Sequence, residues 1–173
     1  MVRCFIAVYP VENEAVYKIQ EELKPLIEGK EVERENMHVT LSFLGEISEM
    51  EIASIKEKLK ELSKQYQKRE ATLTKIKLIP NERFVRVVAI DVAGLEDLSK
   101  DIKEKINGDV KPPHLTLARV KKVKDKKALI EFSRKFFLNQ KIVVNDIKLM
   151  KSTLTRNGPI YEVIEAFPFS KED

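Results

Sequence analysis

Cysteine, tryptophan and glycine are scarce in this sequence: its 173 residues include one cysteine, no tryptophan and five glycines. Because Cys4 has no second cysteine to pair with, an intrachain disulfide is excluded. A structural zinc site is nearly excluded as well, since one cysteine and two histidines far apart in the chain cannot readily supply four ligands. We therefore expect the protein to work without a metal or another cofactor.

Long apolar runs and a strong excess of one charge are also missing. No segment has the length of a transmembrane helix, and the first residues lack the pattern of a signal peptide. We expect a cytoplasmic protein with no membrane partner. The 32 basic and 28 acidic residues leave a net charge of +4, which permits a polyanionic substrate without requiring one. The abundance of lysine and glutamate resembles that of heat-adapted proteins.

Length and composition predict one folded domain. A hydrophobic content of 43% can build a sizeable core, and a chain of this length is normally one domain or two small lobes that share a core. No linker rich in glycine, serine or proline divides the sequence. We therefore predict a single bilobal domain over residues 1–173. Nothing in the sequence demands a dimer, and a monomer is compatible with it.

Apolar periodicity predicts alternating strands and helices, and hence an α+β protein. The predicted strands cover residues 2–8, 37–44, 72–79, 84–92, 114–120, 141–153 and 160–167. The predicted helices cover residues 11–28, 95–106 and 126–137. A further helix is expected to begin at a capping box formed by Ser48 and Glu51, with an apolar face that runs from Ile52 to Tyr66.

The order of these elements repeats. Each half runs strand, helix, strand with a His-x-Thr sequence, helix, strand. Residues 5–8 match residues 87–90 in character, and residues 76–78 match residues 147–149. A duplicated unit with a pseudo-twofold axis would bring the two His-x-Thr strands together at that axis. Chance alternation in an α+β chain is the alternative, and the repeated motif favours duplication.

Histidine occurs only twice, and His38 and His114 are both followed by x-Thr-Leu. A lone histidine on a half-buried strand is most often structural, but two in matching motifs point to catalysis. An imidazole has an unperturbed pKa of about 6.5 and exchanges protons near neutral pH. Two imidazoles that face one cleft make an acid and base pair. Such a pair suits a phosphodiester, particularly a cyclic one, because hydrolysis needs a base for water and an acid for the leaving oxygen.

Strand side chains alternate between faces, which predicts the polar lining of this cleft. The residues expected to face it are His38, Thr40 and Ser42 in the first motif and His114, Thr116 and Ala118 in the second. The hydroxyls of Thr40 and Thr116 would then donate to the non-bridging oxygens of a phosphate. This chemistry requires no metal.

Four segments together carry a family resemblance: RCFIA at residues 3–7, MHVTLSFLG at 37–45, PHLTLAR at 113–119 and GPIY at 158–161. They resemble the 2H phosphoesterases, named for two His-x-Thr/Ser motifs. The sequence is most similar to the archaeal and bacterial RNA 2′,3′-cyclic phosphodiesterases, historically called 2′-5′ RNA ligases. The resemblance covers nearly the whole chain.

This resemblance implies a duplicated bilobal α+β fold, with an antiparallel sheet in each lobe, helices outside and a central cleft that carries both motifs. It implies that the first and last strands share one lobe while the middle of the chain forms the other. It also implies hydrolysis of RNA 2′,3′-cyclic phosphate ends to 2′-phosphates, with reversible 2′-5′ ligation as a weaker activity. By analogy His38 protonates the leaving 3′ oxygen and His114 activates water. The motif pattern itself would be unchanged if these roles were reversed.

Arg119 matches a family arginine placed near the substrate phosphate. Simple alternation puts Arg119 on the face away from His114, so it reaches the site only through a bulge or at the strand end. Its alternative is a surface position. Arg3 and Phe5 share a face of the first strand, and both could border the cleft. The alternative is that Arg3 forms an ion pair and Phe5 belongs to the core. Tyr161 is either a stacking platform for a base or a structural residue.

A run of lysines follows the second motif: Lys121, Lys122, Lys124, Lys126 and Lys127. Such a run either steers an RNA backbone toward the cleft or is a solvated loop in a lysine-rich protein. The expected partners are RNA ends or small cyclic nucleotides. The alternative function is a module that binds a nucleotide or RNA end without chemistry, although binding alone does not need two proton carriers.

Overall fold

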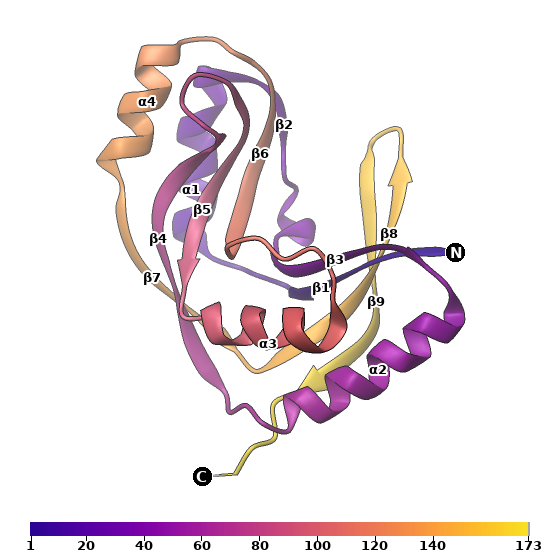
Figure 1. The fold of residues 1–173 in the computed structure, drawn as a ribbon. Coiled ribbons are helices and arrows are strands. Elements are labelled where there is room, and N and C mark those ends of the chain that lie inside the picture. The colour runs from indigo at the N-terminus through magenta and orange to yellow at the C-terminus, as the bar shows by residue number, and fades with distance from the viewer. Residues whose placement is uncertain (173) are drawn as a thin grey trace.

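The computed structural model describes residues 1–172, and within them nine strands form a single antiparallel sheet (Figure 1). The strands are β1 (Val2–Val8), β2 (Ile27–Glu31), β3 (Val39–Ile47), β4 (Arg69–Pro80), β5 (Val85–Ala93), β6 (His114–Val123), β7 (Phe137–Val144), β8 (Asp146–Thr155) and β9 (Gly158–Pro168). The α-helices are α1 (Glu14–Leu23), α2 (Glu49–Ser63), α3 (Glu96–Ile106) and α4 (Lys126–Lys135). The predicted α+β class is confirmed.

The strand order is symmetric about its middle: β7-β4-β5-β6-β3-β1-β8-β9, with β2 added on β6. The two central strands, β6 and β3, are joined at a single register pair, Val39 with Leu115. Figure 1 shows β4, β5 and β6 on one side of the molecule and the β8–β9 hairpin on the other. The first and last strands therefore share one lobe, and the middle of the chain forms the other, as the resemblance implied.

Register confirms the internal repeat residue by residue. Ala7 on β1 pairs with Thr40, and Ala89 on β5 pairs with Thr116. On the outer side Ala7 pairs with Lys148 of β8, and Ala89 pairs with Lys77 of β4. Residues 5–8 and 87–90 are thus structural equivalents, as are residues 76–78 and 147–149. The pseudo-twofold axis passes between β3 and β6, which carry the two histidine motifs.

The helices cross between the lobes. Helix α1 follows β1 in the chain but packs against β6, and α3 follows β5 but packs against β3. Helix α2 covers β8 and β9, and α4 covers β4. The predicted capping box at the start of α2 is present: the Glu51 backbone N–H donates to Ser48 Oγ at 3.1 Å, and Glu51 Oε1 accepts from the Ser48 N–H. One hydrophobic cluster extends through both lobes.

The helix predicted over residues 11–28 is wrong at both ends. Helix α1 begins at Glu14, after the cap Asn13, and stops at Leu23, since Pro25 cannot supply the backbone N–H that a continuing α-helix needs. A 3₁₀ turn, Lys24–Leu26, follows, and the chain then enters β2, which was not predicted. Only Ile27 of β2 is buried, so the strand shows no apolar alternation.

The last predicted helix and the strand after it are also wrong in their bounds. Helix α4 ends at Lys135, two residues before the predicted end, and β7 begins at Phe137. The strand predicted over residues 141–153 is two strands, because the chain turns at Asn145 between β7 and β8. These two strands lie on opposite sides of the sheet order. Among the described residues no helix has both the length and the apolar character needed to cross a membrane.

Candidate active site

Each His-x-Thr strand contains a β-bulge one residue after its threonine. On β3 the register passes from Thr40, opposite Ala7, to Ser42, opposite Ile6, which leaves Leu41 as the extra residue. On β6 it passes from Thr116, opposite Ala89, to Ala118, opposite Val88, which leaves Leu117 extra. A bulge reverses the alternation of the side chains that follow it. The two bulges are equivalent under the pseudo-twofold axis.

The predicted cleft positions of Ser42 and Ala118 are therefore wrong. Both side chains are fully buried, and Ser42 Oγ has no hydrogen-bond partner among the residues described. The residues that line the cleft in their place are Phe43 and Arg119. Arg119 thus reaches the site through the kind of bulge that the sequence analysis required of it. The sequence analysis did not place Phe43 in the cleft. Its position could have been found from the internal repeat, because Phe43 is equivalent to Arg119.

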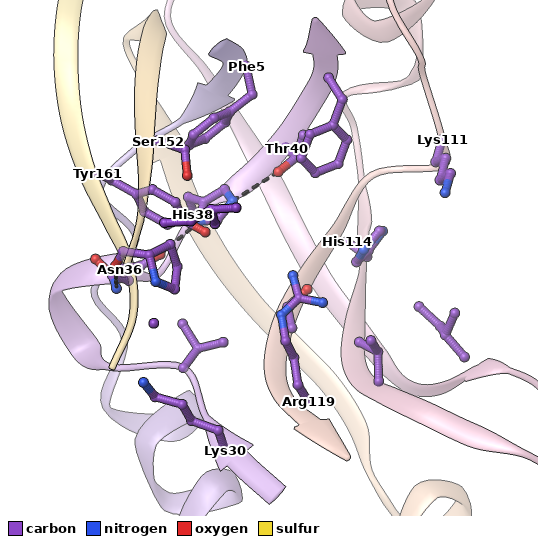
Figure 2. Close-up of a pocket in the computed structure, with 18 of the residues that line it drawn as sticks. Phe5, Lys30, Asn36, His38, Thr40, Lys111, His114, Arg119, Ser152 and Tyr161 are labelled. Carbon is purple, nitrogen blue, oxygen red and sulfur yellow. Dashed lines mark hydrogen bonds between the residues drawn. The ribbon is translucent and has the colours of Figure 1, made fainter. Parts of the chain in front are cut away.

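The two motifs open into one cleft of about 910 Å³. His38, Thr40, His114, Thr116 and Arg119 all line it. Figure 2 shows the side chains of His38 and Thr40 on one side of this space and those of His114 and Arg119 across from them. The two histidines, two threonines and one arginine predicted to act on a phosphate are thus brought to one cavity.

Both imidazoles are anchored in the same way. His38 Nδ1 lies 2.7 Å from the carbonyl oxygen of Asn36, and His114 Nδ1 lies 2.9 Å from that of Pro112, in each case two residues earlier in the chain. A carbonyl oxygen can only accept, so each Nδ1 must carry the proton. This leaves each Nε2 as the nitrogen that can give or take a proton during a reaction.

His38 is held among aromatic rings. Its ring centroid lies 5.2 Å from that of Phe5 and 5.1 Å from that of Tyr161, whose ring meets it edge-on. Its Nε2 lies 2.9 Å from Thr40 Oγ1, which donates to the neutral imidazole. Burial lowers the pKa of His38; the Asn36 carbonyl raises it, and the nearby His114 and Arg119 lower it. His38 is therefore neutral at pH 7 in the free protein.

Tyr161 and Phe5 form part of the cleft floor. The two rings meet edge-on at 5.0 Å. Phe5 forms a small buried cluster with Ala7 and Met150, and Tyr161 packs against this cluster. Burial raises the pKa of the Tyr161 hydroxyl, while the positive charges of Arg119 and Arg3 lower it. Phe5 thus has a core role and borders the cleft at the same time, which combines the two alternatives left open by the sequence.

Positive charge dominates the lining of the cleft. The cationic residues are Arg3, Lys30, Lys77, Lys111 and Arg119, and the acidic ones are Glu31 and Glu33. Lys77 lies 3.9 Å from Asp91. The other four cations form no ion pair with any of residues 1–172. The site is suited to an anion.

The lysine run after the second motif lies elsewhere. Its members lie on the end of β6, in the turn after it and at the start of α4, and none lines the cleft formed by the described residues. Within the same residues, no three histidine, cysteine, aspartate or glutamate side chains are grouped as the ligands of a metal ion would be.

Comparison with known proteins identifies the family. The sequence matches the family described as LigT like Phosphoesterase over residues 8–89 and 92–161, one segment around each motif. The chain belongs to the LigT-like phosphoesterase family. It is 40% identical to the RNA 2′,3′-cyclic phosphodiesterase of Methanocaldococcus jannaschii, over 94% of this chain and 98% of that protein. It is 33% identical to the enzyme of the same name from Aquifex aeolicus, over 96% of this chain and 97% of that one.

Solved structures share this fold over nearly the whole chain. The crystal structure of TT0787 of Thermus thermophilus has a TM-score of 0.85 at 25% identity, covering 99% of this chain and 100% of that one. E. coli LigT complexed with 3′-AMP has a TM-score of 0.71 at 20% identity, covering 98% of this chain and 99% of that one. This LigT-like chain thus shares its α+β fold with both solved structures over almost its whole length.

Proposed function

We propose that this chain is an RNA 2′,3′-cyclic phosphodiesterase that converts cyclic phosphate ends to 2′-phosphates without a metal. One geometric feature supports this most strongly: two equivalent histidines, one from each lobe, are both anchored through Nδ1, which leaves two Nε2 atoms for proton transfer. The curated relatives named as this enzyme support the same reaction. Because each lobe supplies one histidine, the working unit is the whole chain as one bilobal domain over residues 1–173.

The reaction follows from these groups. One Nε2 takes a proton from water, whose oxygen attacks phosphorus. The bond from phosphorus to the 3′ oxygen breaks, and the other Nε2 protonates that oxygen as it leaves, so the phosphate remains on the 2′ oxygen. The hydroxyls of Thr40 and Thr116 donate to the non-bridging oxygens, and Arg119 offsets their charge.

By analogy with the 2H phosphoesterases, we assign the acid to His38 and the base to His114. An acid must be protonated before it acts, and burial holds His38 neutral in the free protein. A bound phosphate brings a negative charge beside the imidazole and raises the pKa of His38, so substrate binding favours the protonated form that an acid needs. Thr40 Oγ1, which donates to the neutral ring in the free protein, then turns to the phosphate and leaves the protonated Nε2 to donate to the leaving oxygen.

A short RNA that ends in a 2′,3′-cyclic phosphate tests this function when it is incubated with the protein in EDTA. We expect a 2′-phosphate product, and we expect His38→Ala and His114→Ala each to lower kcat at least about 100-fold with unchanged folding by circular dichroism. Full activity in either variant, or activity that only an added metal restores, would refute the mechanism. Binding without product would favour a module that only holds RNA ends, an alternative that the enzyme names of the relatives disfavour.

A further inference from the structure

Lys30 enters the cleft from β2, the strand that sequence periodicity did not predict. In the β2–β6 pair its register partner is Arg119, and both side chains line the cleft. Figure 2 shows Lys30 and Arg119 toward the same end of the cleft, with Lys111 at the other end. Lys30 has no carboxylate partner within ion-pair distance among residues 1–172, although Glu31 and Glu33 line the same cleft.

The ammonium group of Lys30 lies against the tip of the β8–β9 hairpin. A Cβ atom added to Gly158 would lie 2.5 Å from Lys30 Nζ, so the ammonium occupies the space that a side chain there would take. The tip is in turn tied to the loop before His38, because Asn36 Nδ2 donates to the carbonyl oxygen of Pro159 at 3.3 Å. The ammonium group of Lys30 therefore lies beside a hairpin tip that is hydrogen-bonded to the loop before His38.

Lys30 lies beyond the group that would contact the reacting phosphate. The bulge at Leu117 leaves two strand steps from Thr116 to Arg119, roughly 6.6 Å at about 3.3 Å per residue. The backbone of Lys30 is a further strand spacing away, about 4.8 Å to the side. One nucleotide unit can bridge this separation. A second phosphate is thus within reach of Lys30 when the first lies between the histidines.

We propose that Lys30 binds the phosphodiester on the 5′ side of the terminal nucleotide, so that the cleft takes an RNA strand and not only a cyclic mononucleotide. This subsite rests on the proposed function. An ammonium group suits phosphate as a point charge, and contacts to phosphate position a strand without reading its bases. Beside Lys30, the register partners Leu154 and Pro159 line the cleft from the hairpin, and Leu154 is 66% exposed. They offer an apolar surface to the sugar and base of the preceding nucleotide.

Two substrates that differ only by the upstream nucleotide test the subsite: a nucleoside 2′,3′-cyclic phosphate and a dinucleotide with the same cyclic end. For the wild type we expect kcat/KM about tenfold higher for the dinucleotide. Lys30→Met should reduce this ratio to about one, and Lys30→Arg should keep most of it. The control Lys111→Met removes a lysine at the opposite end of the cleft and should keep the ratio.

Charge and salt separate a phosphate contact from a general effect on the fold. An uncharged methylphosphonate in place of the upstream phosphodiester should abolish the preference in the wild type and cost nothing further in Lys30→Met. The plot of log kcat/KM against log salt should be steeper by about 0.7 for the dinucleotide, and this difference should vanish in Lys30→Met.

Three results would overturn the subsite. The first is a wild type with no preference for the dinucleotide, and the second is a preference that survives in Lys30→Met. The third is a preference lost in Lys111→Met alone, which would place the upstream strand at the other end. Hydrolysis of neither substrate by the wild type is a different result, because it would refute the proposed function and the subsite with it.

Discussion

The two histidines have matching anchors but different surroundings. Each Nδ1 donates to the carbonyl oxygen two residues before it. The rings of Phe5 and Tyr161 enclose His38, whereas in the described part of the chain no aromatic ring packs against His114. Burial among these rings lowers the pKa of His38, so two groups of one chemical type lie in different surroundings.

A titration of the histidine rings by NMR should show this difference. We expect His38 in the free protein to titrate below its ordinary pKa of about 6.5, because burial disfavours the charged ring. Adding adenosine 2′-phosphate, a product of the proposed reaction, should raise this pKa. One limb of the pH profile of kcat/KM, which reports the free enzyme, should accordingly lie below pH 6.5. Tyr161→Ser, which opens the ring to water, should move the pKa of His38 back toward 6.5.

A His38 that titrates at or above 6.5 in the free protein would contradict this expectation.

The threonines of the two motifs should contribute less than the histidines. Thr40→Ala and Thr116→Ala each remove one hydroxyl from the cleft, and we expect each to lower kcat about 10- to 1000-fold, as for other lost donors to a transition-state oxyanion. Thr153→Ala is the matched control, since it removes an exposed hydroxyl that does not line the cleft. Equal losses in all three variants, measured with the same cyclic substrate, would mean that the motif hydroxyls have no special role.

At the level of elements, most strands and helices could be predicted, and two of the features that could not, strand β2 and the bulges, share a cause. Strand β2 has one buried residue in five, because it pairs with β6 alone and has little core to cover. The bulges at Leu41 and Leu117 each add one buried residue to a strand that is already rich in apolar residues, so the sequence of the strand does not show them. Both features depend on a partner strand far away in the sequence, and local periodicity contains no information about that partner.

Gly29 tests how closely β2 must approach β6. A Cβ at this position would lie 2.1 Å from the carbonyl oxygen of Arg119, so Gly29→Ala must push the strands apart. We expect a loss of about 1–3 kcal/mol in the free energy of unfolding, measured with urea. Because β2 carries Lys30 and pairs beside Arg119, kcat/KM should also fall.

Gly94→Ala, a glycine substitution outside β2, is the control for Gly29→Ala. Gly94 has a φ of +100°, so the substitution strains the backbone, but the residue does not line the cleft. It should lower stability by about 1 kcal/mol and leave kcat/KM unchanged. Wild-type kcat/KM in Gly29→Ala, despite a similar loss of stability, would show that β2 does not position the cleft.

For the whole molecule, the repeat was visible in the sequence but the way its halves are joined was not. The two His-x-Thr motifs and residues 76–78 and 147–149 already indicated equivalent units, and register confirms them. The exchange of helices, with α1 on β6 and α3 on β3, could not be predicted. Both helices are amphipathic. An amphipathic pattern predicts that one face of a helix packs against a sheet, but it does not predict which strands lie under that face.

The difference between Phe43 and Arg119 has a consequence for the direction of the substrate. These residues occupy equivalent places after the two bulges. With the same residue at both, turning a cyclic nucleotide end for end would present similar surroundings and exchange the tasks of the two histidines. A ring on one side and a guanidinium on the other make these poses unequal in energy, because only one of them brings the anion to Arg119. The difference at this one pair of positions thus adds to the polarity that the rings around His38 and the lysine of β2 already give the cleft.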